Sequence, residues 1–230
     1  MAGDLLIFDF DGTLADTWRD IATGLNRTLR EAGLDEATAP EVRDWVGRGV
    51  RRLIARAIDD PDPARIEPLY QRFRVHYADC CLDTTALYPG MRAALDALGP
   101  RHRLAILSNK PQLFLDQIAA GLGIAERFAA VVGGDALAVS KPDPATLADV
   151  VARLHGTAGD RVWMIGDSAV DVETGRRFGA RTIGCAWGLR PRAELEESGA
   201  EVIIERPDEL IGIIEPVAGS AGVPPAAGKR

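Results

Sequence analysis

The pattern of apolar and polar residues predicts short buried strands that alternate with amphipathic helices. Leu5–Phe8 is a compact apolar run between a glycine and acidic residues, which is typical of a strand buried on both faces. Further strand patterns lie at 103–107, 129–132, 161–165 and 181–186, and helical patterns lie between most of them, at 111–121, 143–154 and 169–178. This alternation predicts an α/β fold built on a parallel sheet.

One long stretch after the first strand interrupts the alternation. It contains helical patterns at 21–32, 50–58 and 63–78 but no strand pattern, and turn residues at 88–90 mark the return to alternation. The predicted parts of the chain are an α/β core (1–15 and 84–215), a small all-helical cap inserted after strand one (16–83), and a flexible tail rich in proline, glycine and alanine (216–230).

Composition and charge narrow the classes of protein that are possible. The 230 residues, 47% hydrophobic and 27% charged, fit a globular chain with one large domain or a large and a small one. A formal net charge of -7 argues against binding to nucleic acid or to an anionic membrane surface. The N-terminus resembles neither a signal peptide nor a membrane span, so we expect a cytoplasmic protein. The three cysteines lack the spacing of a metal site, which predicts free buried thiols. The sequence leaves the oligomeric state open.

The strongest chemical signal follows the first strand directly. Asp9 and Asp11 are two residues apart, so both carboxylates can project from the carboxyl edge of the sheet, where open α/β sheets bind ligands. Neighbouring carboxylates repel each other unless one holds a proton or a cation lies between them. Mg²⁺ suits such an oxygen-rich site, and Gly12 lets backbone N–H groups turn toward an anion.

Three further motifs follow predicted strands or precede predicted helices. Ser108 and Asn109 open a helix, where a hydroxyl and backbone N–H groups form either a phosphate site or an ordinary N-cap. Lys141 could neutralise a carboxylate and a phosphate together, although a single lysine is usually solvated. Asp167 ends a strand and could face the same metal, while Asp171, in the first helical turn, could orient its ligands. Capping alone does not explain four such motifs.

The chain resembles the haloacid dehalogenase superfamily of phosphatases up to about residue 214. The motifs Asp-x-Asp-Gly-Thr, Ser-Asn, Lys and Gly-Asp-x-x-x-Asp occur in that order, and they imply a Rossmann-like, doubly wound core with a cap and an aspartyl-phosphate mechanism. The likeness implies these roles: Asp9 as nucleophile, Asp11 as general acid and base, Ser108 and Lys141 as phosphate ligands, and Asp9, Asp11 (through its carbonyl) and Asp167 as ligands of Mg²⁺.

The expected substrate is a small phosphorylated metabolite. Gly47-Arg48-Gly49, with the residues that follow and Ser-Asn-Lys at 108–110, resembles the phosphoglycolate phosphatase branch of the superfamily. Arg48 could bind the carboxylate of 2-phosphoglycolate, or the glycines could simply shape a turn with a solvated arginine. We expect magnesium-dependent hydrolysis of 2-phosphoglycolate to glycolate and phosphate.

Several alternatives stay open at this point. The same cap signal fits a phosphatase for a sugar phosphate or pyrophosphate, and the same core fits a phosphomutase similar to β-phosphoglucomutase. A dehalogenase is less well supported, because it would need neither magnesium nor Asp11. A domain that only binds phosphate would be expected to lack Asp9 or Asp11, and both are present.

Overall fold

The core of the protein is a six-stranded sheet in which every neighbouring pair of strands is parallel. The computed structural model describes residues 3–155 and 161–215. The strand order is β5-β4-β1-β6-β7-β8. The strands are β1 (Leu5–Phe8), β4 (Arg103–Leu107), β5 (Ala130–Val132), β6 (Val162–Gly166), β7 (Arg181–Cys185) and β8 (Val202–Ile204). The predicted α/β class with a parallel sheet is confirmed, and β8 is a strand that the apolar pattern did not reveal.

β1 lies at the centre of the sheet and is buried on both faces. Leu5 and Ile7 belong to one hydrophobic cluster, whereas Leu6 and Phe8 belong to another, as the alternation of side chains along a strand requires. All four side chains are fully buried. The helices that accompany the sheet are α5 (Met91–Leu98), α6 (Gln112–Gly121), α7 (Ala145–Arg153), α8 (Ala169–Phe178), α9 (Arg192–Glu197) and α10 (Glu209–Ile214). A short 3₁₀ turn lies at Ala125–Arg127.

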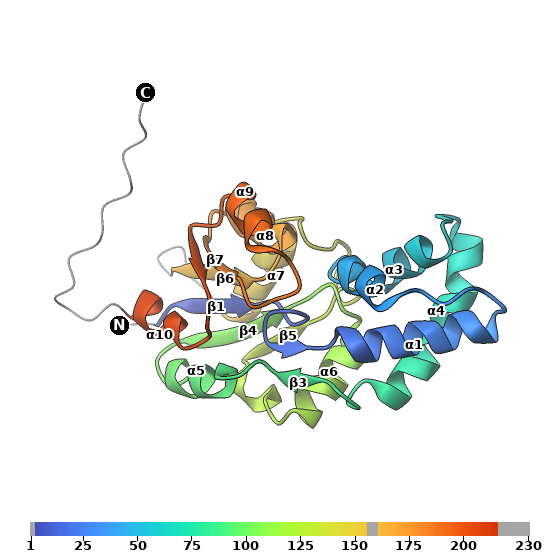
Figure 1. Ribbon diagram of the computed structural model, residues 1–230. Coiled ribbons are helices and arrows are strands. Elements are labelled where there is room, and N and C mark those ends of the chain that lie inside the picture. Colours follow the sequence, from blue (N-terminus) through green and yellow to red (C-terminus); the bar gives the residue numbers. More distant parts are fainter. Residues whose placement is uncertain (1–2, 156–160, 216–230) are drawn as a thin grey trace.

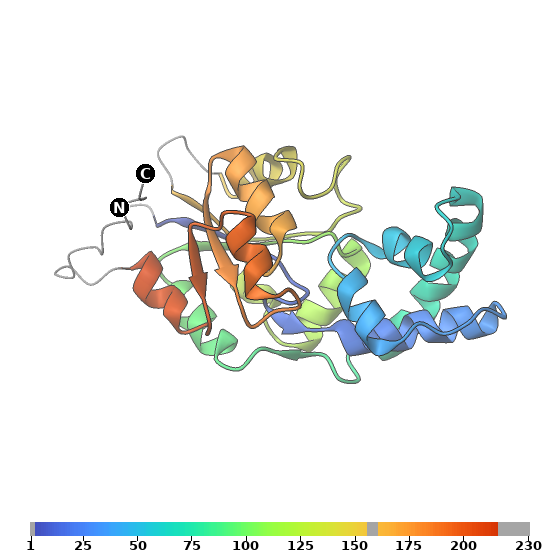
Figure 2. The same cartoon turned by 45° about the horizontal axis from the view of Figure 1, so that its top comes forward.

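Four helices form a separate lobe beyond the carboxyl ends of the strands (Figures 1 and 2). This helical lobe consists of α1 (Trp18–Glu31), α2 (Ala39–Trp45), α3 (Val50–Ala57) and α4 (Pro63–Cys80). The chain enters it through β2 (Ala15–Asp16) and leaves it through β3 (Ala86–Leu87), which pair with each other in antiparallel fashion. The two connections between lobe and core therefore lie side by side.

Asp20 fastens the start of the lobe to the segment that leaves it. Its buried carboxylate accepts hydrogen bonds from the backbone N–H groups and hydroxyls of Thr84 and Thr85, at distances from 2.6 to 3.0 Å. A buried carboxylate with this many donors is well compensated for its loss of water. The contact fixes α1 relative to β3.

Most predicted elements match observed ones within a few residues at their ends. In the lobe, the patterns at 21–32, 50–58 and 63–78 correspond to α1, α3 and α4, whereas α2 was not predicted. That helix begins with a capping box between Thr38 and Glu41, a signal that propensity alone does not weigh.

Two other sequence-based expectations concern the cysteines and the ends of the chain. Cys80, Cys81 and Cys185 are free and buried, as predicted. No helix within 3–155 and 161–215 is long and apolar enough to cross a membrane. The predicted flexible tail, 216–230, lies outside the described residues.

Candidate active site

The chemically important residues lie at the carboxyl ends of adjacent strands. Asp9 follows β1, Ser108 follows β4 and Asp167 follows β6, while Lys141 stands in the loop before α7. Because β1 lies between β4 and β6, these strand ends meet at the centre of the sheet. This is the position where the strand order of an open α/β sheet reverses and where such sheets bind ligands.

Lys141 joins two buried carboxylates. Its Nζ lies 2.9 Å from Asp9 Oδ1 and 2.6 Å from Asp171 Oδ1, and all three side chains are buried. Burial alone would lower the pKa of Lys141, but the charges of Asp171 and Asp9 raise it above its ordinary value. Burial raises the pKa of Asp9 to about 6, although Lys141 acts in the opposite direction. The ammonium therefore stays charged beside a partly desolvated carboxylate.

Asp167 is held rigidly beside this pair. Its Oδ2 accepts a hydrogen bond from Leu189 N–H at 2.7 Å, and its Oδ1 accepts one from Thr13 Oγ1 at 3.3 Å. Burial, together with repulsion from Asp171 and Asp9, raises the pKa of Asp167 to about 8. Gly12 permits this approach, since a Cβ at that position would lie 2.3 Å from Asp167 Oδ2. The N–H group of Gly12 donates to the carbonyl of Ala15.

The residues present fit a divalent cation. Carboxylate oxygens of Asp9, Asp167 and Asp171 lie within 4.8 Å of one another, and all three residues are buried. Burial and, after it, the negative charge of Asp171 raise the pKa values of Asp9 and Asp167, and a hard cation would favour their ionised forms. Both oxygens of Asp171 already have partners, Lys141 on one side and the N–H and hydroxyl of Ser168 on the other. Asp9 and Asp167 are therefore the more open ligands.

The carboxylate of Asp11 lies outside this cluster and faces the helical lobe. Its Oδ1 accepts hydrogen bonds from Thr17 Oγ1 at 2.6 Å and from Lys110 Nζ at 2.9 Å. Asp11 and Asp9 both line the same pocket, so the two acids stand at different positions around a single space. They can therefore serve different chemical roles.

Ser108 and Asn109 connect the loops around the site. Ser108 is buried, and its Oγ accepts a weak hydrogen bond from Lys110 N–H at 3.4 Å. Asn109 Oδ1 accepts from Lys141 N–H at 3.0 Å, and its Nδ2 donates to Gly47 O at 3.0 Å. Asn109 thus positions the Lys141 loop and also contacts the helical lobe.

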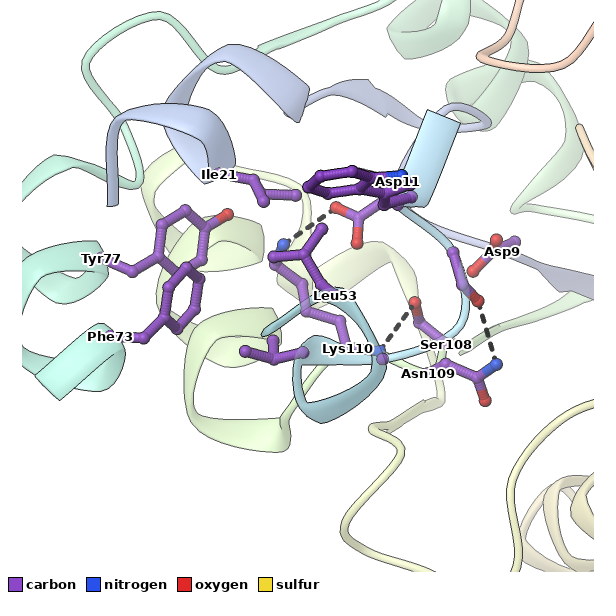
Figure 3. Close-up of a pocket in the computed structure, with 14 residues that line it drawn as sticks. Asp9, Asp11, Ile21, Leu53, Phe73, Tyr77, Ser108, Asn109 and Lys110 are labelled. Carbon is purple, nitrogen blue, oxygen red and sulfur yellow. Dashed lines mark hydrogen bonds and ion pairs between the residues drawn. The ribbon is translucent and has the colours of Figure 1, made fainter. Parts of the chain in front are cut away.

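A pocket lies between this cluster and the lobe (Figure 3). The cavity has a volume of about 30 Å³. The residues that line it are Asp9, Asp11, Ile21, Trp45, Val46, Gly47, Gly49, Val50, Leu53, Phe73, Tyr77, Ser108, Asn109 and Lys110. Apolar side chains from the lobe therefore face charged side chains from the core.

Arg48 is not among the residues that line this pocket. The glycines on either side of it have positive φ angles, +108° at Gly47 and +88° at Gly49, and its side chain is exposed. It lines a neighbouring pocket with Arg51, Arg52, Tyr70, Asn109 and Ser140, among others. A contact between Arg48 and a substrate stays a prediction.

Three residues of the pocket region were given no role from the sequence. Lys110 belongs to the Ser-Asn-Lys motif at 108–110, but that motif alone did not indicate what its side chain contacts. Thr17 and Tyr77 carry no comparable signal. Tyr77 lies one helical turn after Phe73 and stacks on it with ring centroids 5.1 Å apart, which is the pattern of a core residue.

Fold and site together define an α/β protein with buried acids at the carboxyl edge of its parallel sheet and a helical lobe over them. The chain belongs to the haloacid dehalogenase-like hydrolase family, whose model matches residues 6–185. This confirms the predicted family and the prediction that the protein is an enzyme.

Known relatives of similar length act on phosphate esters. The chain is 36% identical to the phosphoglycolate phosphatase of Rhodospirillum rubrum over an alignment 236 positions long, with 96% of each chain covered. It is 35% identical over 217 residues to the N-acetylmuramic acid 6-phosphate phosphatase of Pseudomonas aeruginosa, covering 91% of this chain and 94% of the relative. A predicted phosphoglycolate phosphatase from Haemophilus somnus has a similar crystal structure, with a TM-score of 0.85, 25% identity, and coverage of 92% and 97%. These similarities support a phosphoric monoester hydrolase.

Proposed function

We propose that the protein is a magnesium-dependent phosphatase that hydrolyses 2-phosphoglycolate through an aspartyl-phosphate on Asp9. The observation that carries this proposal is the arrangement of the two acids. Asp9 is buried beside the ammonium of Lys141, whereas Asp11 faces the pocket from another side. A nucleophile and a separate proton carrier on one small space are what a two-step phosphoryl transfer requires.

In the first step an oxygen of Asp9 attacks phosphorus and the bond from phosphorus to the ester oxygen breaks. The carboxyl group of Asp11 gives its proton to the departing oxygen, which leaves as the alcohol of glycolate. Lys141 offsets negative charge on the transferring group, and Ser108 holds a phosphate oxygen. Asn109 contributes by positioning the Lys141 loop.

In the second step the ionised Asp11 takes a proton from water. The oxygen of that water attacks phosphorus, the bond from phosphorus to Asp9 breaks, and inorganic phosphate leaves. Asp11 thus gives a proton in the first step and takes one back in the second, so it returns to its starting state.

Asp9, Asp167 and the carbonyl of Asp11 would hold Mg²⁺, with Asp171 behind them. The bound cation would supply Lewis-acid stabilisation of charge on the phosphoryl oxygens. Asp171 orients Lys141 and Ser168, and through them the loops that carry the ligands. Gly12 contributes by allowing Asp167 to approach the turn after Asp11.

Helical segment 16–83 would act as the cap that closes over the substrate, on a core formed by 1–15 and 84–215. Its side chains complete the pocket, so the pocket exists only while lobe and core are in contact. The lobe residues that line the pocket would contact the group that carries the phosphate, so this segment would set the substrate preference.

The experiment that tests this proposal measures phosphate release from a panel of esters with Mg²⁺ and with EDTA. The panel contains 2-phosphoglycolate, N-acetylmuramic acid 6-phosphate, glucose 6-phosphate and pyrophosphate. We expect a metal-dependent rate that is highest for 2-phosphoglycolate. A dominant rate on either sugar phosphate or on pyrophosphate would reject the substrate but keep the mechanism. In a separate assay with β-glucose 1-phosphate, isomerisation without phosphate release would reject hydrolysis.

A further inference from the structure

Lys110 carries more hydrogen-bonding capacity than its surroundings use. The side chain is buried, and within the described residues its ammonium donates one hydrogen bond, to Asp11 Oδ1 at 2.9 Å. Its Nζ also lies 4.8 Å from the centre of the Tyr77 ring. An ammonium group has three donors, and leaving donors unpaired away from water is costly. The pocket therefore contains an ammonium group that can donate to a further hydrogen-bond acceptor.

The hydroxyl of Tyr77 is the second unused donor of the pocket. Tyr77 is 1% exposed, and its Oη has no hydrogen-bond partner among the residues described. Burial raises the pKa of Tyr77 well above its usual value, so the hydroxyl keeps its proton and can donate. Figure 3 shows the hydroxyl directed into the pocket, on the side where the Lys110 ammonium meets Asp11. Buried hydroxyls without a partner are rare and call for an explanation.

We propose that the Lys110 ammonium and the Tyr77 hydroxyl together bind the carboxylate of the leaving group and so determine substrate specificity. This inference rests on the proposed function and names the residues that would recognise its substrate. A carboxylate offers two oxygens with several lone pairs, which matches two neighbouring donors of which one is charged.

The order of groups along the pocket matches the order of atoms in 2-phosphoglycolate. Phosphorus must lie at Asp9, and the ester oxygen must lie within reach of Asp11. Lys110 Nζ is 2.9 Å from Asp11 Oδ1, and Figure 3 shows this ammonium on the side of Asp11 away from Asp9. A carboxylate one carbon beyond the ester oxygen would therefore arrive beside Lys110 and Tyr77.

Among the described residues that line the pocket, Lys110 is the one with a positively charged side chain. Ile21, Leu53 and Phe73 present apolar surfaces, and Arg48 lies in the neighbouring pocket. A neutral leaving group would cover Lys110 and the hydroxyl of Tyr77 without pairing them, which penalises its binding. The sequence-based assignment of the carboxylate to Arg48 is thus a competing prediction that the same experiment can separate.

The experiment compares 2-phosphoglycolate with ethyl phosphate, in which a methyl group replaces the carboxylate. The measured quantity is the ratio of the two kcat/KM values with Mg²⁺, in the full-length protein. We expect Lys110→Met to lower this ratio about 10- to 100-fold, as the loss of a charge-assisted hydrogen bond predicts. Tyr77→Phe should lower it about 5- to 10-fold, and Lys110→Arg should restore part of the loss.

Tyr70→Phe provides the matched control, because Tyr70 lies on the same helix but lines the neighbouring pocket. Its ratio should match that of the unmodified protein. Equal losses on both esters in Lys110→Met, with an unchanged ratio in Tyr77→Phe, would overturn the inference. A selective loss in Arg48→Ala instead of in Lys110→Met would also overturn it.

Failure of the inference can be told apart from failure of the proposed function. If the unmodified protein does not prefer 2-phosphoglycolate to ethyl phosphate, the proposed substrate is wrong and the inference falls with it. If the preference exists and survives in both Lys110→Met and Tyr77→Phe, only the inference is wrong. Tyr77→Phe removes a single unpaired hydroxyl, so this arm does not depend on whether Lys110→Met folds.

Discussion

The two ends of strand β1 carry aspartates that are equally buried but differently surrounded. Asp4, just before the strand, is 7% exposed, and Asp9, just after it, is 5% exposed. Asp4 accepts hydrogen bonds from Arg161 Nε at 3.0 Å and from Trp163 Nε1 at 2.9 Å, so each of its oxygens has a partner. Asp9 has Lys141 but also the negative charges of Asp171 and Asp11, and burial raises its pKa to about 6.

This difference separates a structural acid from a functional one. At the amino end of the strand, the protein compensates the buried charge within itself, which stabilises the fold. At the carboxyl end, the acids of the cluster repel one another and need a cation or a proton from outside. Incomplete compensation at the carboxyl end would make the binding of a metal and a phosphate favourable there, as the proposed function requires.

The sharpest test of this contrast is Asp9→Asn. Because the amide is a much poorer nucleophile, we expect phosphatase activity to fall about 10⁴-fold or more. The rate of phosphate release with Mg²⁺ measures the effect, and circular dichroism checks that the fold is kept. If more than a few per cent of the activity remains, Asp9 does not form the covalent intermediate.

A second test concerns the metal-free protein and pH. The pKa of Asp9, about 6, and that of Asp167, about 8, both lie above the unfolded value of 3.8. Between about pH 4 and pH 8 the folded protein therefore binds more protons than the unfolded chain. Stability therefore falls as pH rises from about 4 to about 8, on the order of several kcal/mol. Thermal unfolding in EDTA at pH 5 and pH 8 measures this loss.

The control for the pH experiment is the same measurement with Mg²⁺ and with Asp167→Asn. A cation among Asp9 and Asp167 favours their ionised forms, so Mg²⁺ should reduce the decline. Asp167→Asn should reduce it in EDTA by removing the group with the higher pKa. If the stability in EDTA is the same at both pH values, the acids at the carboxyl end are better compensated than we infer.

At the amino end of β1 we expect a substitution to lower stability and to leave activity nearly unchanged. Asp4→Asn removes the charge that pairs with Arg161 and weakens the acceptor for Trp163 Nε1, so it should destabilise the protein by about 2 kcal/mol. Its kcat/KM should stay within about threefold of the unmodified value, because the residue lies at the opposite end of the strand from the site. Urea unfolding and phosphate release measure the two quantities. A large loss of activity without loss of stability would remove the distinction between the two ends.

The smallest expected effect is on the stability of Tyr77→Phe. Removing a buried hydroxyl that has no partner should stabilise the protein by about 1 kcal/mol, while its selectivity for 2-phosphoglycolate falls. Urea unfolding without ligand provides the measurement. If the substitution destabilises the free protein, the hydroxyl has a structural partner, and the contrast between compensated and uncompensated groups does not extend to the lobe.

Elements with a strong apolar pattern or a clear cap could be predicted from the sequence, whereas several very short ones could not. The run Leu5–Phe8 is apolar throughout because both its faces are buried, and α8 begins with a capping box at Ser168 and Asp171. By contrast, β2 and β3 have two residues each, which is too short for any periodicity. β8 (Val202–Ile204) was missed although it is apolar and β-branched, whereas β5, of the same length at the opposite edge, was predicted.

The sequence by itself determined which acids stand at strand ends, because a strand buried on both faces must be apolar and a polar residue marks its end. That rule placed Asp9 and Asp167 at one edge of a parallel sheet, and the same sequence identified the family. Only the tertiary structure decided which donors meet across the pocket. Lys110 and Tyr77 are distant in the chain, and they meet because the lobe folds back over the sheet. Side-chain direction and lobe placement depend on packing between distant segments, which no local pattern records.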